Sequence, residues 1–92
     1  MLGGKWRLLL IRQLATGPKR PSALRRLIPE ISEKMLAQEL RFLLESDLIA
    51  REDYDELPPR VEYSLTQRGR LALPILRAMK EFADAYEAHE AD

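Results

Sequence analysis

The chain has 92 residues, enough for one domain, and 46% of them are apolar and 33% charged, which is the profile of a globular domain rather than a disordered chain. It has no cysteine, so disulfides, thiolate metal sites and cysteine nucleophiles are excluded. The net charge is zero, but residues 1–50 carry nine Lys or Arg against five Asp or Glu, and residues 51–92 carry six against ten, so the first half is better suited to contact phosphates.

Two short helices are predicted in the first third of the chain. Residues 5–15 carry apolar side chains at helical spacing, and Gly17 and Pro18 end that helix. Ser22 is a suitable N-cap for a second helix over residues 23–28. The apolar face of the first helix consists of Trp6, Leu9, Leu10 and Leu14.

A third helix is predicted from Ser32, a good N-cap, to about Ser46. Its apolar stripe, which should face the core, consists of Leu36, Leu40, Leu43 and Leu44. Its opposite face is polar and consists of Lys34, Gln38, Arg41 and Glu45. Two short helices, a tight turn and an amphipathic helix with a polar outer face are the components of a helix-turn-helix.

After the third helix the apolar pattern changes from helical spacing to alternation. Residues 48–54 and 60–65 are predicted to be two strands. The segment 55–59 between them ends in two prolines, which cannot donate ladder hydrogen bonds, so it should form a stiff projecting loop. A hairpin placed directly after the third helix is a wing. The expected fold is therefore mostly α with a small β-hairpin wing, a winged helix-turn-helix, in a single domain over residues 1–92.

A last helix is predicted over about residues 67–88, with Thr66 as its N-cap, and Pro74 should mark a kink or a break in it. Its apolar face could fold onto the wing and core of the same chain. However, it continues past the point where a small core should end, which favours a subunit seam, since an exposed face of this size would be sticky. The expected dimer contacts are Ile75, Met79, Phe82 and Tyr86.

The polar face of the third helix is the candidate DNA-reading surface. A helix fits the major groove, where Gln38 can pair with adenine and Lys34 or Arg41 with guanine or phosphate. Arg60, at the base of the wing, could enter the minor groove, although the acidic residues of the wing would repel phosphate. The alternative for each residue is ordinary solvated surface charge. The expected DNA contacts are Lys19, Arg20, Ser22, Arg25, Ser32, Lys34, Ala37, Gln38, Arg41 and Arg60.

The sequence carries no motif of an enzyme, a cofactor site or a metal site. It has no P-loop, no GxSxG motif and no clustered acid–base pair. Trp6 is expected in the core or in the dimer seam, and His89, the one histidine, is expected to be a solvated residue of an acidic tail. The longest apolar run is residues 8–11 and the first residues lack a secretory signal, so we expect a cytoplasmic location and no membrane partner.

Several motifs, in order along the chain, carry a resemblance to a known family. They are Gly3-Gly4-Lys5-Trp6, Gly17-Pro18-Lys19-Arg20, Ser22-Ala23-Leu24-Arg25-Arg26, Ile31-Ser32-Glu33-Lys34-Met35-Leu36-Ala37-Gln38, Leu40-Arg41 with Leu43, Asp47-Leu48-Ile49 and Pro58-Pro59-Arg60-Val61-Glu62-Tyr63-Ser64-Leu65-Thr66 with Gly69. The last of these is the most specific. With them the chain resembles the HxlR family of winged-helix transcriptional regulators over nearly its whole length.

The resemblance implies a dimeric DNA-binding protein that acts on promoters, usually as a repressor and sometimes as an activator. Members of the family usually carry a further N-terminal segment, often with a cysteine, before the Gly-Gly-Lys-Trp motif. This chain begins at that motif, so we expect thiol-redox sensing to be unavailable to it and its DNA binding to be insensitive to thiol oxidants.

We therefore predict a sequence-specific DNA-binding transcriptional regulator that acts as a homodimer, with the third helix in the major groove of an operator with two related half-sites. The alternative is a winged-helix module that binds another protein and no DNA, which the zero net charge and the acidic wing keep open. Double-stranded DNA and a second copy of the chain are the expected partners, and no cofactor is expected. The operator sequence, the sign of regulation and the existence of a small-molecule effector stay open.

Overall fold

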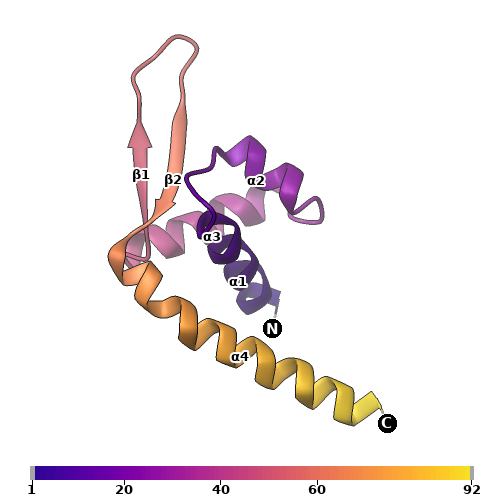
Figure 1. The fold of residues 1–92 in the computed structure, drawn as a ribbon. Helices are drawn as coiled ribbons and strands as arrows, with labels where there is room; N and C mark the ends of the chain where they lie inside the picture. The colour runs from indigo at the N-terminus through magenta and orange to yellow at the C-terminus, as the bar shows by residue number, and fades with distance from the viewer. Residues whose placement is uncertain (1, 92) are drawn as a thin grey trace.

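The computed structural model describes the backbone of residues 2–91 and the side chains of residues 6–86 (Figure 1). Four helices and one antiparallel hairpin follow one another as the sequence predicts. Because His89 lies beyond residue 86, the expectation about its side chain falls outside the described residues. The elements are α1 (Leu2–Leu14), α2 (Pro21–Leu27), α3 (Glu33–Glu45), β1 (Ile49–Asp53), β2 (Val61–Leu65) and α4 (Gln67–Ala91).

The second helix begins two residues earlier than predicted, which changes the role of Ser22. The N-cap position is occupied by Arg20, which makes no capping hydrogen bond with its side chain, and Pro21 is the first helical residue. Proline suits this position because it has no N–H to leave unpaired and its φ is already helical. The prediction that Ser22 caps α2 is therefore wrong, and Ser22 lies exposed within the first turn.

The third helix and the turn after it follow the predicted side-chain chemistry. The hydroxyl of Ser32 accepts a hydrogen bond from the backbone N–H of Met35 at 3.1 Å, which confirms the predicted N-cap. The chain turns at Asp47 with φ of 58°. Thr66 then closes the base of the hairpin, since its hydroxyl donates to the carbonyl of Asp47 at 2.7 Å and accepts from the N–H of Gly69 at 3.0 Å. Thr66 therefore caps α4, as predicted.

Strands β1 and β2 pair in one antiparallel register, with Ile49 opposite Leu65 and Asp53 opposite Val61. Both strands are shorter than predicted, and the connecting segment 54–60 extends the hairpin away from the helices as a projecting wing (Figure 1). The base of the wing is tied to the segment before α2, because the backbones of Lys19 and Tyr63 exchange hydrogen bonds of 2.9 and 2.8 Å.

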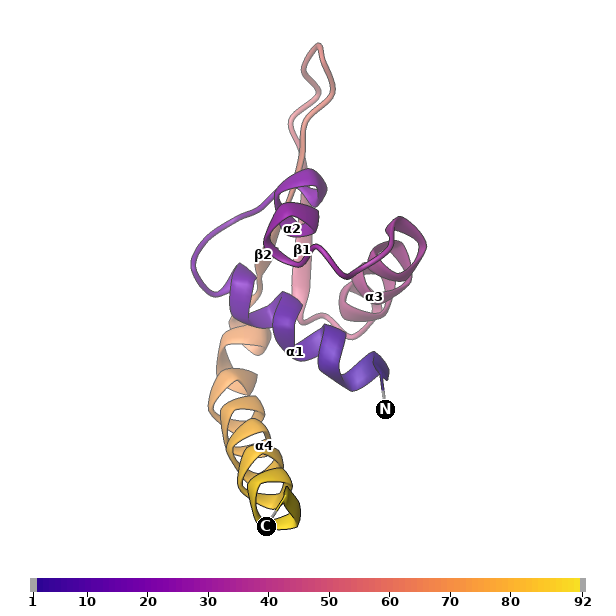
Figure 2. The same ribbon diagram turned by 90° about the vertical axis from the view of Figure 1, so that its right-hand side faces the viewer.

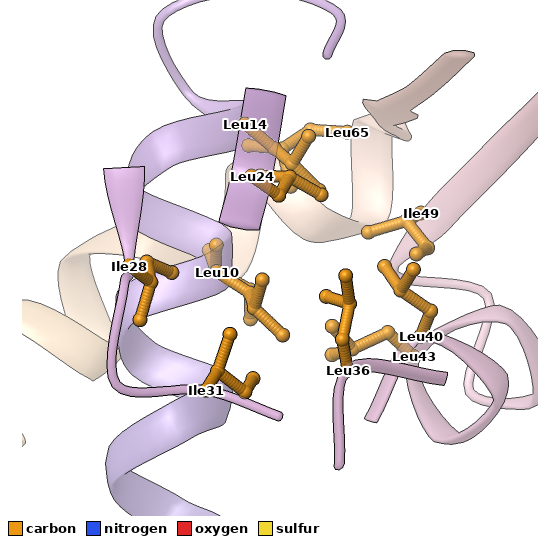
Figure 3. Packing of buried hydrophobic residues seen from close by; sticks show 11 residues of the cluster. Leu10, Leu14, Leu24, Ile28, Ile31, Leu36, Leu40, Leu43, Ile49 and Leu65 are labelled. Atoms are coloured by element: carbon orange, nitrogen blue, oxygen red, sulfur yellow. The ribbon is translucent and has the colours of Figure 1, made fainter. Parts of the chain in front are cut away.

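The hydrophobic core is built from the first three helices and the base of the wing (Figure 3). Its buried members include Leu10 of α1, Leu24 of α2, Leu43 of α3, Ile49 of β1 and Leu65 of β2. Three leucines of the predicted stripe on α3 are buried and the fourth is half-buried, as expected from their spacing. This packing leaves the opposite side of α3 facing outward.

The fourth helix runs without interruption through Pro74. Of the kink or break expected at this residue, the break does not occur. Proline in a helix removes the hydrogen bond to the carbonyl four residues earlier, here that of Arg70. Both residues are exposed, and water can bind the carbonyl that is left over. Among the described helices, none is long and apolar enough to cross a membrane.

Helix α4 lies beside the rest of the molecule from its beginning to about Glu81, which borders a hollow shared with α1. Leu73 and Leu76 pack against the core, while the later turns extend away from it (Figure 1). Gly69 allows the attachment, because a Cβ at this position would collide with the backbone carbonyl oxygen of Leu48. The molecule is consequently elongated, with extents of 54 × 27 × 21 Å.

Candidate nucleic-acid interface

The outward side of α3 presents the polar face predicted from the sequence. Lys34, Gln38 and Arg41 are all exposed, and Ala37 lies exposed among them. Lys34 and Arg41 make no ion pair with any residue that the structure describes. Their charges are therefore available to an anion, and the side chains can reach outward because nothing in the core holds them.

Residues of α2 and α3 border one groove. Ser22 and Arg25 of α2 lie on one side of it, and Ala37 and Arg41 of α3 lie on the other. The groove has a volume of about 630 Å³, and Tyr63 of β2 contributes to its lining. Its apolar lining comes from Leu36, Leu40 and Leu44. The structure thus brings together four of the residues predicted from the sequence, although α2 and α3 are separate in the chain.

Three of the predicted contacts, one of them on the groove, are engaged within the chain. Arg25 makes an ion pair of 2.9 Å with Glu33, between two exposed side chains. The ammonium group of Lys19 donates to the hydroxyl of Thr16 at 2.7 Å and to the carbonyl of Gly17 at 3.2 Å. Ser32 is exposed, but its oxygen already caps α3. Of the cations that precede α3, Arg20 is exposed and forms no ion pair with the described residues.

Arg60 does not join these residues, since its side chain is held by the wing itself. Its guanidinium lies 3.8 Å from the ring centroid of Tyr54 and 3.4 Å from a carboxylate oxygen of Glu56. The hydroxyl of Tyr54 donates to Glu62 at 3.0 Å, and this hydrogen bond raises the pKa of Tyr54 above its ordinary value, so the hydroxyl stays a donor. The acidic side chains of the wing, Glu52, Asp53, Asp55 and Glu56, are exposed.

An apolar face runs along α4 on the side away from the core. The four residues predicted as dimer contacts are exposed there, Ile75 by 63%, Met79 by 63%, Phe82 by 73% and Tyr86 by 56%. The rings of Phe82 and Tyr86 stack with their centroids 6.5 Å apart. Leu71, which is 69% exposed, belongs to the same face and was missed, although its spacing of four residues from Ile75 was a visible signal.

Comparison with known proteins gives one family and a consistent set of relatives. The family model described as HxlR-like helix-turn-helix matches residues 1–91. The HTH-type transcriptional regulator YkvN of Bacillus subtilis is 44% identical over 90 residues, which are 98% of this chain and 76% of that protein. A regulator from Methanothermobacter thermautotrophicus is 46% identical over 89 residues, which are 97% of this chain and 68% of that protein.

A solved structure agrees with the fold. A MarR-family transcriptional regulator from Porphyromonas gingivalis has a TM-score of 0.77 at 49% identity, with 86% of this chain and 78% of that chain covered. At this identity and coverage the likeness bears out the predicted mostly helical fold with its hairpin wing.

Proposed function

The chain belongs to the HxlR-like helix-turn-helix family of transcriptional regulators, which are not enzymes, and we propose that it binds double-stranded DNA sequence-specifically as a homodimer. The observation that carries the proposal is the groove bordered by α2 and α3, with the uncompensated charge of Arg41 beside it. A regulator of this kind acts where the chromosome lies, so we also propose a cytoplasmic location.

In this proposal α3 is the reading helix. Its 13 residues make it about 20 Å long, and the major groove of B-DNA, about 12 Å wide, admits one helix. Gln38 is suited to adenine, and Lys34 and Arg41 are suited to guanine or phosphate. Residues from α2 and the segment before it, Arg20, Ser22 and Arg25, would contact phosphates beside the groove, with Lys19 and Ser32 at its border.

We assign the wing a smaller part in binding than α3. For Arg60 to enter the minor groove, its guanidinium would have to leave the carboxylate of Glu56 and the ring of Tyr54. The exposed carboxylates of the wing would repel phosphates at the same time. The affinity should therefore come mainly from the two helices of the helix-turn-helix.

The second half of the proposal concerns the apolar face of α4. Its exposed side chains form a continuous apolar strip, and such a strip on a small protein marks an interaction surface. Pairing of α4 with α4 of a second copy would bury Met79 and Phe82 of each chain, with about 1.5–3 kcal/mol per buried side chain. A two-fold dimer would present its two reading helices to half-sites about 34 Å apart or a multiple of that distance.

The test is a titration of the protein with DNA at two salt concentrations. One duplex carries a sequence selected from a random pool by the protein, and the other carries a scrambled version of it. We expect tighter binding to the selected duplex than to the scrambled one. The logarithm of the binding constant should fall linearly with the logarithm of the salt concentration, with a slope of about 0.9 per phosphate contact. Affinity that is absent for both duplexes would contradict the proposal and favour the winged-helix module that binds another protein.

A further inference from the structure

Glu39 is the one buried polar or charged residue among those whose burial the structure describes. It lies on α3, and only 5% of it is exposed. Its partner is Arg7 on α1, whose Nε donates to the carboxylate oxygen Oε2 at 2.7 Å. Nothing in the apolar pattern of α3 indicates this pair, because Glu39 lies beside the leucine stripe rather than in it.

Arg7 makes a second contact with the same helix. The centre of its guanidinium lies 3.7 Å from the ring centroid of Phe42. Glu39 and Phe42 are three residues apart and therefore neighbours on one side of α3. One side chain of α1 thus holds two side chains of α3, one by a charge-assisted hydrogen bond and the other by a cation–π contact. Since the guanidinium is planar, the two contacts together fix the direction of approach.

A buried carboxylate penalises any arrangement in which it has no partner. The side chain of Glu39 is only 7% exposed whereas that of Arg7 is 40% exposed, so water screens the charge of the arginine in part. Removing the arginine would leave the buried carboxylate without this hydrogen bond. If α3 rolled or slid along α1, Glu39 would stay buried while losing the Arg7 hydrogen bond. The pair therefore favours one orientation of α3 against α1.

Helix α1 also connects α3 to the helix that carries the apolar face. It contacts both α3 and α4, and it lies between them in the turned view (Figure 2). Leu8 and Arg12 of α1 line a hollow with Leu73 and Leu76 of α4. The orientation of α3 relative to α4 therefore depends on how α3 sits on α1.

We propose that Arg7 and Glu39 are positioning residues, which fix the angle of the reading helix to α4 and thereby the half-site spacing that the dimer accepts. This inference rests on the proposed function. It concerns residues that lie beside the reading face and whose charges are satisfied within the chain, so they are not proposed as DNA contacts.

The experiment compares binding to the selected operator with binding to operators in which the spacer is one base pair longer or shorter. The parent should prefer its own spacing. Arg7→Met keeps an unbranched side chain over Phe42 but removes the donor, and it should reduce this preference by at least about threefold. The salt dependence should stay that of the parent, because no phosphate contact is lost. Arg68→Met, at an exposed position outside the reading face and outside the hollow between α1 and α4, is the control and should keep the parent's preference.

The double variant Arg7→Met with Glu39→Leu removes the pair without leaving a buried charge. It replaces the single variant in the experiment if the single variant does not fold. It should show the same relaxed spacing preference. A variant of either kind that keeps the parent's preference overturns the inference, even if its thermal stability is lower, because the pair would then only stabilise the fold. A parent that binds no DNA overturns the proposed function as well, so the two failures are distinguishable.

Discussion

Lys34 and Arg41, like Arg20, differ from the other cationic candidate contacts because their side chains form no ion pair or hydrogen bond with the described residues. Arg25 and Arg60 are paired with carboxylates, and Lys19 is held by its own loop. A paired cation must exchange one partner for another when it meets a phosphate, so its net gain is small. Lys34 and Arg41 have no such partner among the described residues and should contribute most.

Replacing either residue should therefore weaken binding without unfolding the protein. We expect Lys34→Ala and Arg41→Ala each to cost about 1–3 kcal/mol of operator binding if they contact a base, and to relax the preference at one position. Arg68→Ala, an exposed arginine outside the reading face, is the control. Fluorescence anisotropy with selected and scrambled duplexes measures the effect. Parent-like binding by both variants would show that another surface reads the DNA.

Helical spacing predicted which side of α3 is exposed, but it did not predict which charged side chains form ion pairs within the fold. The exposure of Lys34, Gln38 and Arg41 follows from their offset from the leucines, which is a local property. The pairing of Glu39 with Arg7 joins residues 32 positions apart, and it depends on how α1 crosses α3. A single sequence contains no signal for such a contact.

Among the secondary-structure elements, α2 and α3 begin in different ways. The serine before α3 caps it with a hydrogen bond, whereas α2 begins at Pro21 and its serine lies inside the first turn. Both serines precede helical patterns, and the sequence predicted the same role for both. Pro21 decided the difference, because a proline at the first helical position moves the start of the helix ahead of Ser22.

The two serines provide a matched pair of substitutions. Ser32→Ala removes the bond to the N–H of Met35 and should lower the free energy of unfolding by about 1 kcal/mol. Ser22→Ala removes no side-chain hydrogen bond that the structure describes, so the change should stay within about 0.5 kcal/mol. Urea denaturation at one fixed protein concentration measures both. If both variants lost the same free energy of unfolding, the capping hydrogen bond of Ser32 would make no specific contribution to stability.

At the scale of the whole molecule, the elongated shape comes from α4. Its first turns belong to the core, and its later turns carry apolar side chains that the chain itself leaves uncovered. A domain of 92 residues has a modest core, so the burial of this face in a dimer would also add to its stability. The sequence predicted this face from its spacing and placed the end of the helix near residue 88, close to its observed end at Ala91.

The assembly can be tested with one substitution on each side of α4. Phe82→Asp places a charge in the apolar face and should convert the dimer to monomers, with weaker operator binding as a result. Arg77→Gln changes the net charge by the same amount on the side that faces α1, and it should leave the dimer intact. Sedimentation equilibrium gives the masses. If the Phe82→Asp variant remains dimeric, the dimer interface lies on another surface. If the parent is monomeric, the proposed homodimer is wrong.

Because Gly69 lies so close to the carbonyl of Leu48, any change at this position would tilt α4 about its first turn. The helix from Gly69 to its end at Ala91 is about 33 Å long at 1.5 Å per residue. A side chain at position 69 that tilted the helix by about 10° would move its far end by about 6 Å, more than the rise of one helical turn. A methyl group buried beneath the wing would thus displace ring systems at the opposite end of the molecule. The effect of a substitution at this glycine should therefore depend on how far it displaces the end of α4, rather than on the space lost locally.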